Sequence, residues 1–309
     1  MKKISIVIPA HNEEGNVALV HEKIKEVFSG LHDYDFEIIF VNDGSRDSTQ
    51  QKLEELSAQY DEVKFIEFSR NFGHQPAVKA GLDHAHGNAV ISMDGDLQHP
   101  PELIPHMIKK WEEGYDVVYT IRTYPKQISY FKRKTSDFFY KMLSSLSDVD
   151  LTKGGGSDFR LLDANAVEVM RSFTEDDLFL RGLTSWMGFR QTGIEFTANE
   201  RIAGESSYNL KKMVTFAFTG ITAFSVKPLY IAAYLGFLFS ALSVVGYVGY
   251  VIYSFVVETE ISGWASLIMT IVFFGGLQLI IMGIMGIYLG KIFKQVKERP
   301  NYIIKNKNF

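Results

Sequence analysis

The feature that most constrains the fold of this chain is a long apolar block near its C-terminal end. Residues 228–290 contain no Lys or Arg, and their only formal charges are two glutamates near the midpoint. The apolar spans on either side of these glutamates, 228–257 and 261–290, are about 30 residues each, whereas roughly 20 residues cross a bilayer. Tilt can absorb the excess length. The block therefore predicts two transmembrane helices over 227–290 and argues against a buried hairpin in a soluble core.

The charges that flank this block predict its orientation. Lys211, Lys212 and Lys227 precede the first span, and six Lys or Arg lie between 291 and 309. By the positive-inside rule, both ends of the pair face the cytoplasm, together with everything upstream. We therefore expect a multi-pass membrane protein with its N-terminal part in the cytoplasm. Residues 291–309 are expected to form a basic cytoplasmic tail against the inner surface.

Composition excludes several classes of protein. A length of 309 residues fits one large domain or two smaller ones, and the net charge of −4 indicates no general affinity for nucleic acid. The absence of Cys excludes disulfides and zinc–thiolate sites. The N-terminus does not read as a signal peptide, because its apolar run is only seven residues long, from 4 to 10.

Upstream of the block, short apolar runs alternate with segments of helical periodicity. The runs read as strands at 4–8, 36–41, 63–68, 89–93 and 116–121. Such alternation with short links predicts an α/β fold, with a mostly parallel sheet covered by helices on both faces. Ligands of such sheets bind outside the carboxyl ends of the strands, where the polar clusters of this sequence fall. Neither the G-x-G-x-x-G nor the P-loop pattern is present.

A pair of aspartates follows the fourth apolar run. Residues two apart in an extended chain point to the same side, so Asp94 and Asp96 are expected to project together. Two carboxylates held this close repel each other unless a cation lies between them. Oxygen ligands without Cys or His suit a hard ion, Mg²⁺ or Mn²⁺, which would neutralise a departing diphosphate. For an isolated D-x-D motif, an acidic turn that binds no metal is the ordinary alternative.

Three further stretches carry functional hypotheses. Residues 125–147 alternate apolar and basic side chains, which is typical of an amphipathic helix at a membrane interface or of an ordinary surface helix. The glycine-rich loop 154–160 is expected to lead into a helix containing Leu161 and Leu162, either approaching a ligand or acting as a hinge. Residues 211–226 are expected to form a second interfacial helix beside the membrane.

Taken together, these motifs resemble those of family-2 glycosyltransferases of GT-A fold. The matching segments are V-I-P-A-H-N-E-E at 7–14, V-N-D-G-S at 41–45, N-F-G-H-Q at 71–75, M-D-G-D-L-Q-H-P-P-E at 93–102, S-D-F-R-L-L-D at 157–163 and R-I-A-G-E-S at 201–206. The branch resembled includes dolichyl-phosphate mannose synthase and the bacterial bactoprenol glucosyltransferases. The resemblance implies a cytoplasmic GT-A domain over 1–210, a Rossmann-like unit, in a multi-pass protein of the bacterial inner membrane.

The resemblance also implies roles for individual residues. It implies a nucleotide-sugar site of Pro9, Asn12, Glu13, Asp43, Gly44, Asp94 and Gln98, with Asp43 accepting the N–H of a uracil ring. It implies a metal site of Asp94, Asp96 and Gln98. Arg201 would pair with the diphosphate, since a guanidinium suits phosphate oxygens. Asp158 would face the sugar or the attacking phosphate, acting mainly by positioning. The lipid phosphate would be held by Arg122, Lys132, Arg133 and Ser136.

The implied reaction moves a sugar, glucose by preference, from a UDP-sugar to undecaprenyl phosphate or another polyprenyl phosphate, with inversion. The acceptor phosphate has its second pKa near about 6, so it is mostly dianionic at neutral pH and needs no strong base. The implied partners are the nucleotide sugar, the polyprenyl phosphate, membrane lipid, further copies of the chain, a separate flippase and a downstream glycosyltransferase.

Other activities remain open at this stage. The sugar could instead be GlcNAc, mannose from GDP-mannose or an aminoarabinose derivative. A processive polysaccharide synthase shares this kind of sheet, but it usually has more membrane helices and a Q-x-x-R-W box, which does not follow Gln191. A non-catalytic scaffold would be marked by a broken D-x-D motif, whereas the motif at Asp94 and Asp96 is intact.

Overall fold

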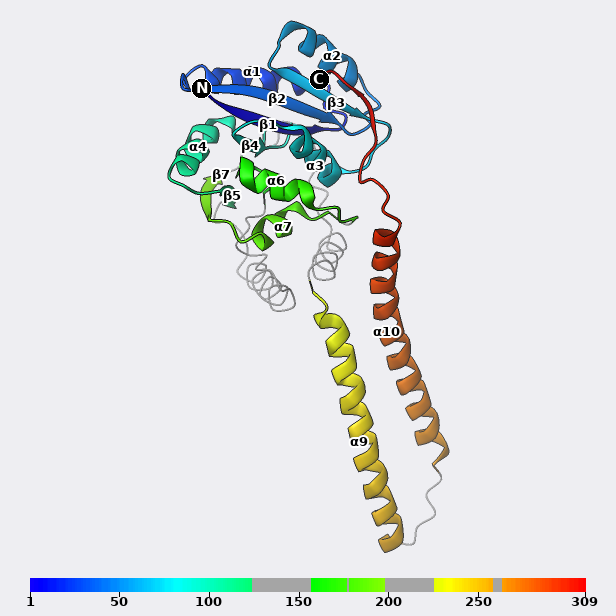
Figure 1. The fold of residues 1–309 in the computed structure, drawn as a ribbon. Helices are drawn as coiled ribbons and strands as arrows, with labels where there is room; N and C mark the ends of the chain where they lie inside the picture. The colour runs from blue at the N-terminus through cyan, green and yellow to red at the C-terminus, as the bar shows by residue number, and fades with distance from the viewer. Residues whose placement is uncertain (124–156, 177, 198–224, 258–262) are drawn as a thin grey trace.

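The computed structural model describes residues 1–123, 157–176, 178–197, 225–257 and 263–309. An α/β domain occupies most of the N-terminal two-thirds of the chain, and two long helices extend away from it (Figure 1). The strands are β1 (Lys2–Ala10), β2 (Tyr34–Asn42), β3 (Val63–Phe68), β4 (Ala89–Ser92), β5 (Val117–Thr123), β6 (Arg160–Asp163), β7 (Gln191–Thr197) and β8 (Ile304–Lys307). The domain helices are α1 (Val17–Phe28), α2 (Thr49–Gln59), α3 (His74–His84), the short η1 (Pro101–Leu103), α4 (Ile104–Glu112), α6 (Ala164–Ser172) and α7 (Leu180–Trp186).

The eight strands form one sheet in the order β7-β5-β6-β4-β1-β2-β3-β8. The pairs β1–β2, β1–β4, β2–β3 and β5–β7 are parallel, whereas β6 and β8 pair antiparallel with their neighbours. The chain runs from β1 to β3 in one direction and then returns to β4 on the other side of β1. The order therefore reverses between β1 and β4, where a crevice for a ligand forms at the carboxyl ends.

Both faces of the sheet are covered, because side chains alternate along each strand. On β1, Ile4, Ile6 and Ile8 pack in one cluster with α1, α2 and α4, whereas Val7 packs in the other with α3, α6 and α7. All four of these β1 side chains are fully buried. The predicted mostly parallel sheet with helices on both faces is confirmed.

One part of the domain differs from the sequence-based expectation. Leu161 and Leu162 lie in strand β6 between β4 and β5, and the helix predicted there begins only at Ala164. The side chain of Asp163 accepts a hydrogen bond from the backbone N–H of Asn165 at 2.9 Å and caps this helix. A short apolar pair fits a strand or a helix equally well, and pairing with two neighbouring strands decides between them.

Helices α9 (Lys227–Val257) and α10 (Trp264–Val296) are long and apolar enough to cross a membrane. Within the candidate spans, almost no side chain of the described residues is buried, as expected for helices that face lipid. Beyond α10 the chain returns to the domain, and β8 extends the sheet beside β3 (Figure 1). The C-terminal residues, which the sequence predicted to lie along the membrane, thus pair with the domain.

Candidate functional site

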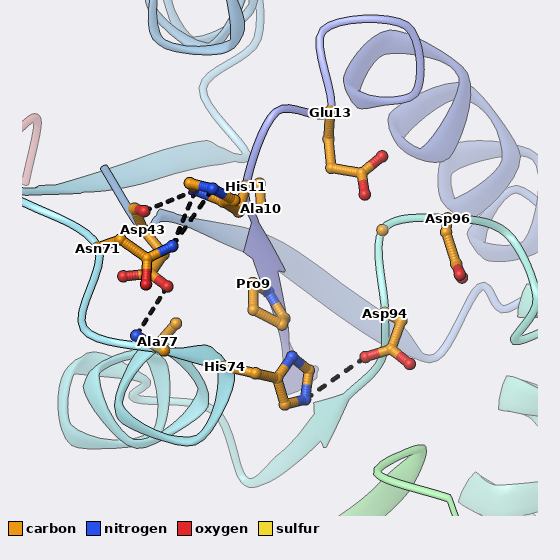
Figure 2. Close-up of a pocket in the computed structure, with 12 residues that line it drawn as sticks. Pro9, Ala10, His11, Glu13, Asp43, Asn71, His74, Ala77, Asp94 and Asp96 are labelled. Atoms are coloured by element: carbon orange, nitrogen blue, oxygen red, sulfur yellow. Dashed lines mark hydrogen bonds and ion pairs between the residues drawn. The ribbon is translucent and has the colours of Figure 1, made fainter. Parts of the chain in front are cut away.

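A pocket of about 370 Å³ opens at the carboxyl ends of β1, β2 and β4 and beside the loop that follows β3. Figure 2 shows Glu13, Asp94 and Asp96 on one side of it, and His11, Asp43 and Asn71 on the other. The lining residues are Pro9, Ala10, His11, Glu13, Asp43, Asn71, Gly73, His74, Ala77, Asp94, Gly95 and Asp96. We call this the edge pocket. It brings together the predicted residues Pro9, Glu13, Asp43, Asp94 and Asp96.

Asp43 fixes the loop that forms one wall of the edge pocket. The two oxygens of its buried carboxylate accept hydrogen bonds from the backbone N–H groups of Phe72, at 2.6 Å, and Gly73, at 2.9 Å. Its backbone oxygen accepts from Nδ1 of His11 at 2.8 Å. Because a carbonyl only accepts, His11 carries its proton on Nδ1. Asp43 therefore ties the ends of β1 and β2 to the loop after β3.

Gly44 and Asn12 complete this wall without lining the edge pocket. Gly44 has a φ of 62°, and a Cβ on it would lie 2.4 Å from the carbonyl carbon of Arg70. Only glycine fits such a close approach of two loops. The backbone N–H of Asn12 donates to Oγ of Ser45 at 2.9 Å, and its side chain accepts from the N–H of Arg46 at 2.9 Å. Both predicted residues thus act by holding loops together.

The acidic motif lies in a turn and not in an extended chain as predicted. Strand β4 ends at Ser92, and Leu97 has a φ of 58°. Asp94 and Asp96 nevertheless both line the edge pocket. Gln98 is buried, and it donates to Asp96 through its backbone N–H at 3.1 Å and its side-chain amide at 2.7 Å. Gln98 therefore orients the Asp96 carboxylate, and it does not line the edge pocket.

The carboxylates of Glu13, Asp94 and Asp96 repel one another. Burial and the nearby carboxylates of Asp158 and Asp96 raise the pKa of Asp94, against the opposing effect of His99 and His74. Burial, with the charges of Asp96, Asp47 and Asp94, raises the pKa of Glu13. A cation in the edge pocket would relieve this repulsion.

The donor atoms present suit a hard divalent ion. Oδ1 of Asp94 is buried and has no hydrogen-bond partner among the described residues, and Asp94 and Asp96 offer only oxygen ligands. Mg²⁺ commonly takes one or two carboxylates and completes its shell with water and substrate phosphates. Within the described part of the chain, no group of three or more His, Asp or Glu forms a complete metal site. The residues thus fit an ion shared with a phosphate-bearing ligand.

Asp158 lies beside the edge pocket, at the centre of a buried polar cluster. It forms ion pairs with Nε2 of His74 at 3.3 Å and Nε of Arg181 at 3.1 Å. Gln75 donates to Asp158 at 3.3 Å and accepts from the backbone N–H of Leu180 at 3.0 Å, so it links the starts of α3 and α7. His74 also approaches Oδ1 of Asp94, at 3.6 Å, and so connects this cluster with the acidic motif (Figure 2).

These contacts decide the charge state of Asp158. Burial alone would raise its pKa, but the hydrogen bond with His74 and the charges of Arg181 and Arg160 hold it well below its usual range. A carboxylate of this kind is a weak base near neutral pH. For His74, burial would lower the pKa, but Asp158 and Asp94 raise it. The cluster is thus built to hold opposite charges in place.

Sequence reasoning assigned no role to His74, Arg181 or His99. His74 and His99 lie inside motifs that had been noted, whereas Arg181 is an isolated basic residue and carries no local signal. The backbone N–H of Asp94 donates to Nδ1 of His99 at 2.9 Å. Nε2 of His99 lies 2.9 Å from Oγ of Ser157, the residue before Asp158. His99 therefore supports both the acidic motif and the Asp158 segment.

Several predicted residues lie outside the described part of the chain. Arg201, Lys132, Arg133 and Ser136 fall there, as do the predicted interfacial helix 125–147, residues 211–224 of the predicted helix 211–226, and residues 154–156 of the loop 154–160. Arg122 lies in β5, where its backbone is in register with Phe196 of β7, but its side chain is not described. The assignments of these residues stay predictions.

Comparison with known proteins gives consistent matches. The family model described as glycosyl transferase family 2 matches residues 5–169. YkcC, an uncharacterized glycosyltransferase of Bacillus subtilis (strain 168), is 45% identical over 302 residues, covering 97% of this chain and 93% of the relative. The bactoprenol glucosyl transferase of Shigella phage SfV is 40% identical over 304 residues, covering 98% of each chain. A crystal structure of glucosyl-3-phosphoglycerate synthase from Mycobacterium tuberculosis covers 72% of this chain and 78% of its own, with a TM-score of 0.47 and 18% identity.

Proposed function

The chain belongs to glycosyl transferase family 2, and we propose that it transfers glucose from UDP-glucose to undecaprenyl phosphate, with inversion at the anomeric carbon. The observation that carries this proposal is the union of two features in one chain. The chain has an acidic pocket at the reversal point of an α/β sheet and, after it, two apolar helices long enough to cross a membrane. Such a chain can take a water-soluble donor from the aqueous phase and a lipid acceptor from the bilayer. Relatives similar over nearly the whole chain are named bactoprenol glucosyl transferases, which supports this choice of acceptor and sugar.

The edge pocket is the proposed donor site. Pro9 of β1, Glu13 of the loop after β1 and Asp43 at the end of β2 line the edge pocket and would contact the nucleotide. Each oxygen of Asp43 already accepts one backbone hydrogen bond and keeps a second lone pair, so the carboxylate can still accept the N–H of a uracil ring. Asn12 and Gly44 would act here by fixing the loops around the nucleotide.

Asp94 and Asp96 would hold a Mg²⁺ or Mn²⁺ ion, and Gln98 would orient Asp96 for this purpose. When bound, the ion supplies charge neutralisation for the diphosphate leaving group. Oδ1 of Asp94 accepts no hydrogen bond from the described residues, and Asp94, Asp96 and Glu13 repel one another; both observations support this assignment. Arg201 would add a fixed positive charge on the diphosphate.

The Asp158 cluster would position the reacting groups. The acceptor phosphate is itself the nucleophile, so the site has to bring an anion towards an anionic donor and need not remove a proton. Asp158, with its low pKa and its ion pairs, suits a role in holding His74 and Arg181 beside the sugar. The basic residues Arg122, Lys132 and Arg133, with Ser136, would hold the lipid phosphate at the membrane surface.

The proposed orientation places the domain and both chain ends in the cytoplasm. Because β8 pairs with β3, the end of α10 and the N-terminal domain must lie on the same side of the membrane. The basic residues that flank the helices support the cytoplasmic side. The product would then form on the inner leaflet, and a flippase and a downstream glycosyltransferase would be needed to use it outside.

The metal assignment is tested by Asp96→Ala in a sugar-transfer assay with lipid acceptor. We expect transfer to be abolished with little change in thermal unfolding, because Asp96 lies in a turn at the pocket and outside the core. Glu102→Ala is the matched control, because Glu102 is an exposed carboxylate six residues further along the chain and does not line the edge pocket. Transfer by the folded Asp96→Ala protein at the wild-type rate, or full turnover of metal-stripped protein in EDTA, would contradict the assignment.

A further inference from the structure

The last residues of the chain lie against the strand that leads into the edge pocket. We call residues 302–309 the C-terminal strap. Its strand β8 pairs antiparallel with β3, and the pairing continues past the end of β3, where the N–H of Ser69 donates to the carbonyl of Ile303 at 3.0 Å. Near the other end, the side chain of Asn308 accepts from the N–H of Phe65 at 2.8 Å. The strap thus covers the edge of β3, which would otherwise be unpaired.

Tyr302 is at the end of the strap that lies beside the carboxyl end of β3. Its ring stacks on that of Phe68, with centroids 5.2 Å apart and planes inclined by 11°. Its hydroxyl donates to the carboxylate of Asp83 at 2.9 Å. Phe68 is the last residue of β3, and Asp83 lies near the end of α3. Tyr302 therefore joins the strand before the loop 69–73 to the helix after it.

The loop 69–73 is the wall of the edge pocket that Asp43 holds. Phe72 packs edge-on against Phe68, at 5.6 Å between ring centroids, and its backbone N–H is one of the two that bind Asp43. The same loop lies directly on Gly44, with no space for even a methyl group between them. A shift of Phe68 would therefore be transmitted to Phe72 and from there to Asp43.

We propose that Tyr302 is a positioning residue for donor binding, which holds β3, α3 and the loop between them in the arrangement that binds the nucleotide. The proposal rests on the donor site assigned above. Tyr302 touches no substrate in this account. It raises donor affinity because the binding-competent arrangement of the loop is populated more fully when its two ends are held.

The same contacts connect the donor site with the membrane anchor. Five residues separate the end of α10 from Tyr302. Near that end, the side chain of Gln295 accepts from the N–H of Asp176 at 2.9 Å and donates to the carbonyl of Thr174 at 3.1 Å. The stretch 174–176 precedes α7, which carries Arg181. The end of α10 thus contacts the segment that leads into α7 and the Asp158 cluster, and the residues after it lead into the strap.

The test compares UDP binding by full-length protein in detergent with Mn²⁺ in excess, measured by calorimetry. Tyr302→Ala should raise the dissociation constant for UDP about three- to tenfold, because it removes an aromatic stack and a hydrogen bond to a carboxylate. Tyr302→Phe keeps the stack and should show a smaller increase. Tyr302→Leu serves as a second variant if the alanine protein does not fold. The apparent KM for undecaprenyl phosphate should not change in any of these proteins.

Tyr34→Ala is the matched control. Tyr34 also packs its ring against the core and donates its hydroxyl to a carboxylate, Glu112, but it lies at the amino end of β2, away from the edge pocket. It should lower the melting temperature without changing UDP affinity. Wild-type UDP affinity in the folded Tyr302 variants would overturn the role of Tyr302 and leave the donor site in place. A loss of UDP affinity in Tyr34→Ala equal to that in Tyr302→Ala would do the same. Absence of UDP binding by the wild-type protein would overturn the donor site and, with it, this inference.

Discussion

Glu37 offers a sharp test of how the sheet is stabilised, because it is a buried charge held by three side-chain donors. Its carboxylate lies on β2 and accepts from Oγ of Ser5 at 2.6 Å. It also pairs with Nζ of Lys3 at 2.7 Å and Nζ of Lys64 at 2.6 Å. Burial alone would raise the pKa of Glu37, but these partners outweigh it and lower the pKa from 4.5 to about 2.

This lowered pKa converts into a pH-dependent stability. A group whose pKa is lower in the folded state stabilises the fold above its unfolded pKa, and that stabilisation is lost as the pH falls toward the folded value. The change in pKa contributes about 3 kcal/mol to the free energy of unfolding at neutral pH. The loss should begin near pH 4.5 and continue toward pH 2. Glu37→Gln removes the charge and should remove this pH-dependent part.

The assay is thermal unfolding of the wild-type and Glu37→Gln proteins in detergent between pH 7 and pH 3.5. At pH 7 the melting temperature of the variant should be about 6–12 °C below that of the wild type. This gap between the two melting temperatures should narrow as the pH falls. The control is Glu26→Gln, because Glu26 forms an exposed pair with Lys23 that contributes at most about 1 kcal/mol. A gap that stays constant with pH, or no gap at pH 7, would refute the reasoning.

Three further predictions concern the site and the membrane. Gly44→Ala should lower the melting temperature and raise the donor KM, because the new methyl group would meet Arg70; an unchanged donor KM would show that the loop contact is not needed. Arg133→Ala should raise the apparent KM for lipid acceptor more than that for donor, and an unchanged lipid KM would move the acceptor site elsewhere. In intact cells, an impermeant maleimide should label a Cys introduced at Thr259 but not one at Asn306, and the chain offers no native Cys to interfere. The reverse labelling would overturn the proposed orientation.

The sequence predicts those parts of the fold that depend on local pattern. The period of apolar residues predicted the first five strands and the helices between them. It also predicted that Asp43, Asp94 and Asp96 would meet at one edge of the sheet, which the edge pocket confirms. The length and apolar character of α9 and α10 were equally local signals, and these two helices match the predicted spans closely.

The features that the sequence did not predict depend on contacts between distant residues. Strand β8 reads Ile-Lys-Asn-Lys, which has no apolar alternation, and it forms because the edge of β3 offers unpaired backbone groups. Arg181 pairs with Asp158 across 23 positions of sequence, and no local pattern marks such a pair. The acidic motif turns after β4 where an extended chain was expected, and Leu97 takes a positive φ that is rare for a residue other than glycine.

The proposed transfer is measured by offering purified protein a panel of radiolabelled sugar nucleotides together with undecaprenyl phosphate. We expect transfer from UDP-glucose to the lipid, dependent on Mg²⁺ or Mn²⁺, with a single sugar joined to the phosphate in inverted configuration. Transfer of another sugar in preference would correct the donor and leave the site in place. Failure to label the lipid from any sugar nucleotide, or formation of a polymer, would contradict the account.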